Sequence, residues 1–306
     1  MSYFTALFNS LPGVANLGII YGIAAIGVFI TFRILDFADL TVDGSFATGG
    51  AVFAVLSVAG VNIVRALIVA FLAGMAAGLI TALIHCYLGI PGILSGILTQ
   101  LMLWSINLVI LGKANQPIMT RGALISSSST GTSIGILLAI AALVVGVLYW
   151  FFGTKYGASV RSAGSNPAMS KANGISVNNR KIIALMISNG LVALGGALFA
   201  QYNGAADINN GRGFIVIALA AIIIGGAIVK KWGKNFAIQL SFVLVGGIIY
   251  YFVYQAIALI NGINTEWLKM LSAVVVVIFL AIPYVKSHYF ADLKAKHNRN
   301  KANEAE

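Results

Sequence analysis

The sequence predicts an all-α membrane protein, a polytopic bundle of about 8–10 transmembrane segments with one of them broken or re-entrant. Hydrophobic residues make up 59% of the 306 residues and charged residues only 9%, so the chain cannot build a water-soluble surface. The apolar residues form long uncharged runs and do not alternate with polar ones. A membrane β-barrel needs that alternation, whereas a helix needs about 20 apolar residues to cross a bilayer, so helices are favoured.

The uncharged runs divide into membrane segments joined by short connections. The first apolar run is too long for a cleaved signal peptide, so we expect it to remain as a helix. Two of the segments are short for a full crossing. Residues 1–285 form the membrane domain, and residues 286–306 form a polar tail. The expected segments are 14–32, 45–60, 63–84, 92–112, 134–152, 182–202, 214–229, 236–260 and 268–284.

The charged residues indicate which side of the membrane each connection occupies. Nineteen Lys and Arg against eight Asp and Glu give a net charge of +11, but they stand beside apolar runs without a nucleic-acid recognition motif. The positive-inside rule places the connection 154–181, the cluster 230–234 and the tail in the cytoplasm. The C-terminus is then cytoplasmic, and the N-terminus is outside if every segment crosses. A re-entrant segment near 34–45 or 90–99 would reverse the side of the N-terminus.

The connection 154–181 contains the signals of a short helix. Asn166 suits an N-cap, Pro167 the first helical position and Gly174 a left-handed position after the last turn. This helix is too short to be stable alone, so it needs a partner. Two interpretations remain open: docking into a groove of a soluble subunit, or lying on lipid headgroups. The apolar face consists of Ala168, Met169 and Ala172.

Three acidic residues follow the first segment: Asp36, Asp39 and Asp43. Acids within a bilayer are costly and usually functional. One hypothesis is a broken helix near 35–45 that lines a translocation path, with Asp39, Thr41, Asp43 and Ser45 as its polar groups. The alternative is structural: Asp43 caps the helix that follows, and Asp36 pairs with Arg33 at the headgroups.

A second polar face is expected on the fourth segment. Gln100, Trp104 and Asn107 are spaced by four and three residues, which places them on one side of a helix. That face either contacts a solute or supplies hydrogen bonds between helices. Asp207 and Arg212 flank an external turn. His85 and Cys86 are too small a set for a metal site, so no metal is expected.

The motifs together resemble a known family. The segment 164–175, GSNPAMSKANGI, is similar to the coupling loop of ABC-type importer permeases of the branched-chain amino acid and ribose class. Residues 36–50 resemble the segment that follows the first helix in this family, particularly in the subgroup associated with tryptophan and tyrosine uptake. Residues 211–226 resemble the start of a late helix in this family. The resemblance covers most of residues 14–285. Branched-chain members usually carry neutral or His-containing residues at the acidic positions, so their substrate does not transfer directly.

The resemblance implies a transport subunit without covalent chemistry. It implies a homodimer in a bacterial cytoplasmic membrane, a cytoplasmic ABC ATPase on the loop helix, and an extracytoplasmic substrate-binding protein. The chain contains no Gly-x-x-x-x-Gly-Lys-Ser/Thr motif, so ATP would be bound by the partner and no cofactor by this chain. An aromatic or branched-chain amino acid is the expected solute, with a nucleoside or sugar as competitor. The alternative is a secondary transporter that uses the acidic residues for proton or cation coupling; a membrane enzyme is disfavoured.

Overall fold

The computed structural model describes residues 3–118, 124–127, 130–229 and 235–260, with a few residues between 267 and 281. Within these residues the chain is a bundle of helices and one short two-stranded ribbon, in which Asn115 lies opposite Asp207. The helices are α1 (Tyr3–Phe29), the π-helix η1 (Ile30–Ile34), α2 (Thr41–Val58), α3 (Ile63–Leu88), α4 (Gly92–Leu111), α5 (Thr130–Gly153), α6 (Lys155–Ser165), α7 (Pro167–Ala172), α8 (Val177–Asn203), α9 (Phe214–Val229) and α10 (Phe236–Ala258); the strands are β1 (Asn115–Pro117) and β2 (Ala205–Asp207).

The predicted fold class is confirmed. Seven helices of the described part, with α1 and η1 counted as one, are long and apolar enough to cross a membrane. At 16 residues, α9 reaches only about 24 Å by helical rise, less than the roughly 30 Å of a bilayer core. The first helix begins at Tyr3, earlier than the predicted position 14, because Pro12 is accommodated inside it. The predicted segment 268–284 and the basic residues of 230–234 and 286–306 lie mostly or wholly outside the described residues.

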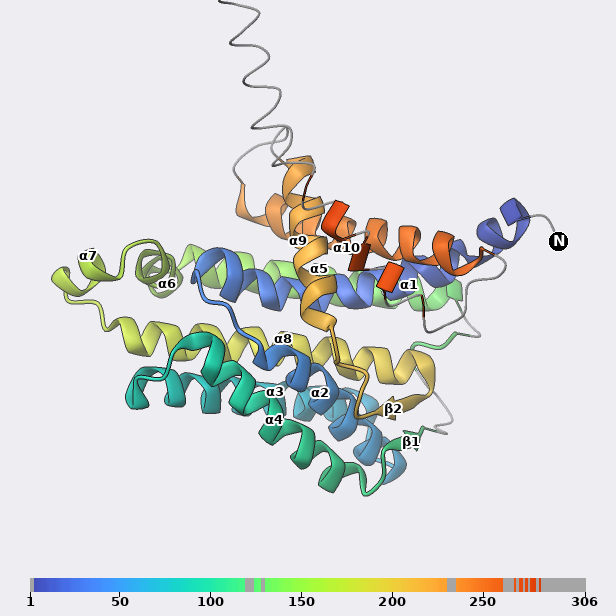
Figure 1. The fold of residues 1–306 in the computed structure, drawn as a ribbon, viewed down its shortest axis with the longest axis horizontal. Helices are drawn as coiled ribbons and strands as arrows, with labels where there is room; N and C mark the ends of the chain where they lie inside the picture. The colour runs from blue at the N-terminus through green and yellow to red at the C-terminus, as the bar shows by residue number, and fades with distance from the viewer. Residues whose placement is uncertain are drawn as a thin grey trace, which may run out of the picture.

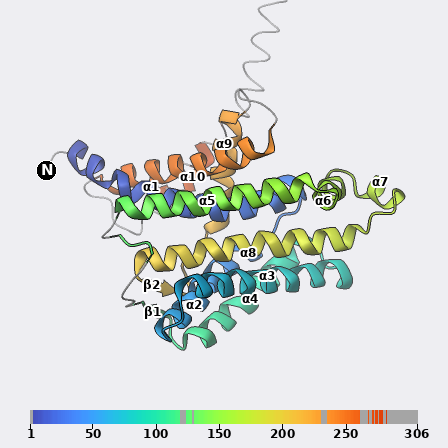
Figure 2. The same ribbon diagram turned by 180° about the vertical axis from the view of Figure 1, so that it is seen from behind.

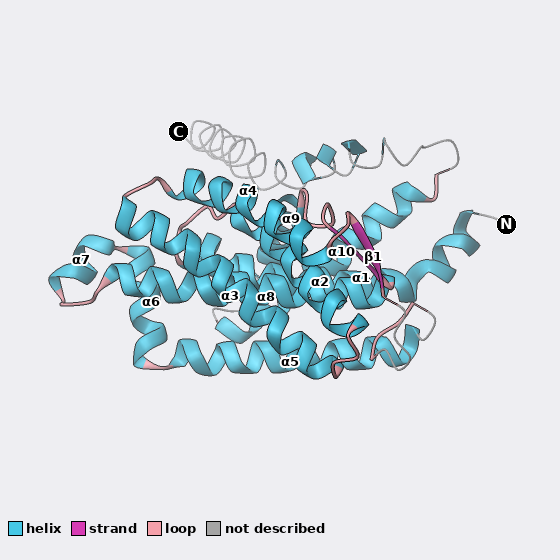
Figure 3. Ribbon diagram, turned by 90° about the horizontal axis from the view of Figure 1, so that it is seen from below, coloured by secondary structure: helices cyan, strands magenta, loops and turns pink. Residues whose placement is uncertain are grey.

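The long helices run between two ends of the molecule (Figure 1). The helices α6 and α7 lie at one end, and β1, β2 and the start of α1 lie at the other. Figure 2 shows the same separation from behind, with α5 and α8 extending from one end toward the other. Figure 3, turned to show the bundle from below, again places α7 opposite β1. The predicted cytoplasmic connection and the predicted external turn are therefore at opposite ends.

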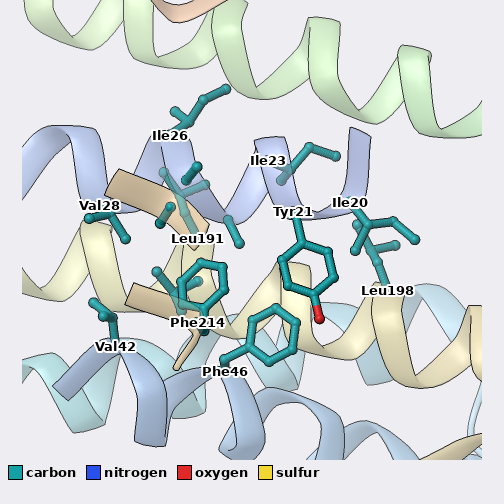
Figure 4. Close-up of a cluster of buried hydrophobic side chains, with 14 of the residues drawn as sticks. Ile20, Tyr21, Ile23, Ile26, Val28, Val42, Phe46, Leu191, Leu198 and Phe214 are labelled. Atoms are coloured by element: carbon teal, nitrogen blue, oxygen red, sulfur yellow. The ribbon is translucent and has the colours of Figure 1, made fainter. Parts of the chain in front are cut away.

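The core is built around α1. Its most apolar window is 83% buried, against 28% for α4 and 22% for α5, so α4 and α5 lie on the outside. Tyr21, Phe46 and Phe214, from three different helices, meet in the interior (Figure 4), where the rings of Phe46 and Phe214 stack with centroids 4.8 Å apart. This aromatic cluster fixes the start of α9 against α1 and α2.

Candidate functional site

The chain is interrupted between α1 and α2, at residues 35–40. The π-helix η1 ends the first crossing, and Asp36 adopts a left-handed backbone with φ of +52°. The Phe37 N–H donates to the Thr31 carbonyl, 2.9 Å away, and α2 begins at Thr41. The structure thus contains a non-helical break within the predicted range 35–45, between two separate membrane helices. Asp36 is exposed and forms no ion pair with Arg33, so the predicted headgroup pair is wrong. Asp36 instead directly follows the C-cap residue of η1, and its left-handed backbone turns the chain out of the helix.

A buried hydrogen-bond network connects this break to α8 and α3. One Asp39 carboxylate oxygen accepts from the Thr41 N–H at 2.9 Å, and the other accepts from the Asn189 side-chain amide at 2.7 Å. Asn189 Oδ1 accepts from the Ser45 hydroxyl at 2.6 Å. The hydroxyls of Thr41 and Thr81 lie 2.7 Å apart. Asp39, Thr41 and Ser45 are therefore enclosed by protein, and Asp39 supports the start of α2.

Asp43 caps a helix, but a different one from the helix predicted. Its two carboxylate oxygens accept from the backbone N–H groups of Gly213 and Ile215, at 2.9 and 2.8 Å, in the turn that begins α9. The predicted capping of α2 is wrong because α2 already begins at Thr41, before Asp43. Gly211 packs directly on the Asp43 carbonyl, where a methyl group would clash, and Gly213 has φ of +82°. Asp43 therefore holds the turn 208–213 against the broken helix.

Asp43, α4 and this turn border an open pocket of about 310 Å³. Ligand pockets in proteins span roughly 300–1,000 Å³, so this one suits a small solute. The predicted face of α4 points into it, while Trp104 stays 41% exposed and Asn107 is 1% exposed. The residues that define its chemistry are Asp43, Gln100, Trp104, Asn107, Ile208 and Arg212.

Asn107 lies at the wall of this pocket, almost fully buried. Its amide donates to the Gly44 carbonyl of α2 at 3.4 Å, so the alternative prediction of hydrogen bonds between helices holds for this residue. Its carbonyl oxygen, Oδ1, is buried without a partner among the described residues. The path residues predicted from sequence thus fall into two groups. Asp43, Gln100, Trp104 and Asn107 line the pocket, whereas Asp39, Thr41 and Ser45 belong to the buried network.

The short helix of the connection forms as predicted. The Asn166 side chain accepts from the Met169 N–H at 3.0 Å, Pro167 is the first helical residue, and Gly174 has φ of +75°. Ala168, Met169 and Ala172 are exposed, and Met169 retains 63% of its accessible surface. The local sequence signals therefore predicted this helix and its ends.

The helix α7 is joined to the broken helix through α6. The hydroxyls of Ser170 and Ser162 lie 2.7 Å apart and hold α7 on α6. Gly164 of α6 packs on the backbone of Ile34 and Leu35, at the end of η1, so closely that a side chain would clash. A displacement of α7 would thus reach the break through two direct contacts.

The same end of the bundle carries a basic pair between α3 and α8. The Lys181 ammonium donates to His85 Nε2 at 3.0 Å, and His85 Nδ1 donates to the Ile90 carbonyl at 2.9 Å. Both ring nitrogens are therefore engaged. Among the described residues, no group of three or more His, Cys, Asp and Glu side chains is arranged to hold a metal ion.

Two contributors to the site were not predicted from sequence. Asn189, which bridges Asp39 and Ser45, stands alone as an amide within an apolar run, and that isolation is the signal that marks it. Arg212 was predicted only as part of an external turn, whereas it lines the pocket. No local pattern in the sequence brings this turn to α4.

The chain was compared with known proteins. Residues 10–280 match the model of the family described as branched-chain amino acid transport system, permease component. The chain belongs to this family. The permease is 40% identical over 276 residues to a tyrosine transport system permease protein of Clostridioides difficile (strain R20291), covering 89% of this chain and 91% of that protein. It is 23% identical over 288 residues to the ribose import permease protein RbsC of Escherichia coli K12, covering 92% and 87%.

A third relative is the uncharacterized protein RP368 of Rickettsia prowazekii (strain Madrid E), 35% identical over 262 residues, covering 85% of the permease and 92% of that protein. No solved structure matches the chain. The family match spans the break, the pocket and α7. The permease is accordingly a multi-pass membrane transport component and not itself an enzyme.

Proposed function

We propose that this chain is the membrane subunit of an ATP-driven importer for an aromatic or branched-chain amino acid. Two copies form the transport unit, a separate ABC ATPase drives it from the cytoplasm, and an extracytoplasmic binding protein delivers the solute. The observation that carries the proposal is the exposed apolar face of α7, combined with the family match.

The geometry of α7 supports ATPase docking. A six-residue helix is unstable in isolation, so its cap and its contact with α6 must hold it in place. Ala168, Met169 and Ala172 remain uncovered by the described part of the chain. An exposed Met at the tip of a braced helix suits insertion into an apolar groove of a partner.

The amino acid assignment is supported by the relative named for tyrosine transport and by the content of the pocket. The pocket joins an aromatic ring, amides and charges of both signs in a space for a small solute. A sugar is the competing solute, because the ribose permease is also a relative. The exposed outer faces of α4 and α5 are available for lipid or for the second copy.

Uptake measurements test this function. Labelled tyrosine, tryptophan, leucine, ribose and uridine are offered to cells that lack the chain and to cells in which it is restored. We expect restored uptake of at least one of the three amino acids, abolished by depletion of ATP while the ion gradient is kept. Uptake that persists without ATP would contradict an ABC importer and support a secondary transporter. Restored uptake of ribose or uridine alone would contradict the amino acid assignment.

Substitutions on α7 test the docking face. Met169→Asp places a charge in an apolar contact, which costs several kcal/mol unless the charge is paired. We expect the variant to insert normally but to lose co-purification with the ATPase and uptake. Asn179→Asp introduces the same charge at an exposed position in the first turn of α8 and should leave both intact. Normal ATPase binding by Met169→Asp would contradict docking on this face.

A further inference from the structure

The pocket between α2, α4 and the turn 208–213 contains complementary groups whose individual roles the transport proposal does not assign. Its wall brings together a cation, an indole ring and, just behind the surface, a buried acceptor without a partner among the described residues. A ligand that complements the pocket has to satisfy all three groups.

The unpaired acceptor is Asn107 Oδ1. Asn107 is 1% exposed, and its amide nitrogen is occupied by the Gly44 carbonyl. A buried carbonyl oxygen without a donor costs about 1–3 kcal/mol, and its uncompensated dipole makes this wall favourable for a positively charged group. Asp43 adds a negative charge beside it. Because both Asp43 oxygens already accept a backbone N–H, Asp43 sets the local potential and keeps the turn in place.

The cation is Arg212. Its backbone N–H donates to the Asn209 carbonyl, but its guanidinium forms no hydrogen bond or ion pair with the described part of the chain. A free guanidinium at a pocket wall is suited to bind a carboxylate through two parallel hydrogen bonds. The indole of Trp104 lines the same space and offers a flat apolar surface for an aromatic or branched side chain.

From these groups we infer that the pocket is a binding station for the zwitterionic head of a free α-amino acid. The ammonium group lies against the wall at Asn107 in the negative potential of Asp43, Arg212 binds the carboxylate, and the side chain lies on Trp104. This inference rests on the proposed function and deepens it, because it makes the permease selective in its own right. A sugar carries neither charge, and an inorganic ion has no apolar side chain to pack on the indole ring.

Binding to the purified permease alone tests the station. The chain is placed in lipid nanodiscs without ATPase or binding protein, and labelled tyrosine is displaced by unlabelled tyrosine, tyramine, 3-(4-hydroxyphenyl)propionate or ribose. Tyramine lacks the carboxylate and the propionate lacks the ammonium. We expect each to compete at least about tenfold more weakly than tyrosine, because each loses a charged hydrogen-bond partner. The same competition is measured with labelled leucine, with isoamylamine as the analogue that lacks the carboxylate.

Two variants separate the two ends of the ligand. Arg212→Gln should weaken tyrosine binding about tenfold or more and remove its advantage over tyramine, while tyrosine still outcompetes the propionate. Asn107→Leu should remove the advantage of tyrosine over the propionate, while tyrosine still outcompetes tyramine. Arg65→Gln removes an exposed cation on α3 outside the pocket and should bind like the unmodified chain. Arg212 is exposed, so its variant should fold even if Asn107→Leu does not.

The outcomes distinguish the station from the importer. Absence of tyrosine and leucine binding to the permease alone, with ATP-driven uptake intact, overturns the station and leaves the importer standing. An equal loss of tyrosine, tyramine and propionate binding in Arg212→Gln also overturns it, because a general disturbance does not select one end of the ligand. Selective binding together with uptake that does not need ATP contradicts the importer and retains the station.

Discussion

Asp43 illustrates how one side chain can position two helices. Its carboxylate accepts two backbone N–H groups at the start of α9, where a negative charge also complements the helix dipole. The Gly213 donor lies 170 residues further along the chain. The contact is possible only because Gly211 carries no side chain, so that the turn rests on the Asp43 carbonyl. The glycine pair around Arg212 is therefore required by the geometry of the pocket.

Gly211→Ala is expected to disturb this contact. The added methyl group clashes with the Asp43 carbonyl, and the forced shift should lower the free energy of unfolding by about 1–3 kcal/mol. Thermal unfolding of the purified chain, followed by tryptophan fluorescence, measures the loss. Gly226→Ala is the matched control, because its methyl group would enter open space on α9 and should raise stability slightly. Equal stability of the two variants would contradict the close packing of the turn.

At the scale of elements, the break between α1 and α2 is held from several sides. Asp36 ends the first helix, Gly96 of α4 packs on the Leu40 backbone, and Gly164 of α6 packs on Ile34. The contact with Gly164 is the one through which a movement of α7 would reach the break. Because packed backbones do not compress, α6 and η1 must move together.

Gly164→Ala should therefore uncouple the transporter. The methyl group would push α6 away from η1, while the docking face of α7 is unchanged. We expect uptake to fall severalfold while the ATPase still co-purifies, in contrast to Met169→Asp. Gly153→Ala, at the end of α5, meets no neighbouring atom and serves as the control. Loss of ATPase binding in Gly164→Ala would show that the substitution acts on docking and not on transmission.

The extent of sequence-based prediction follows from the range of the interactions. The caps of α7 and the common face of Gln100, Trp104 and Asn107 depend on residues a few positions apart, and local rules predicted both. The partners of Asp43 and the place of Arg212 depend on how α9 packs against α2, which no local pattern encodes. The acids were recognised as unusual, but their separation into a buried network and a pocket required the structure.

At the scale of the whole molecule, the two ends of the bundle differ in their proposed function. The end with α6 and α7 carries the proposed ATPase contact, and the end with β1 and β2 lies toward the pocket turn (Figure 1). The helix α1 begins at the β1–β2 end (Figure 1), where the Tyr3 hydroxyl donates to the Ala256 carbonyl at the end of α10. In the proposed orientation, with α7 in the cytoplasm, the start of the chain is expected outside the cell, on the side of the proposed binding protein.

Cysteine labelling tests this orientation in cells. In a Cys86→Ser background, Asn173→Cys places one thiol at the exposed end of α7, and Asn209→Cys places one in the exposed turn after β2. We expect an impermeant thiol reagent to label Asn209→Cys in intact cells, and Asn173→Cys only after the membrane is opened, because basic connections are retained in the cytoplasm. Both variants should be labelled in opened membranes, which controls for accessibility. Labelling of Asn173→Cys in intact cells would show that the orientation is the reverse of the one proposed. The α7 face would then be outside the cell, where a cytoplasmic ATPase cannot bind it.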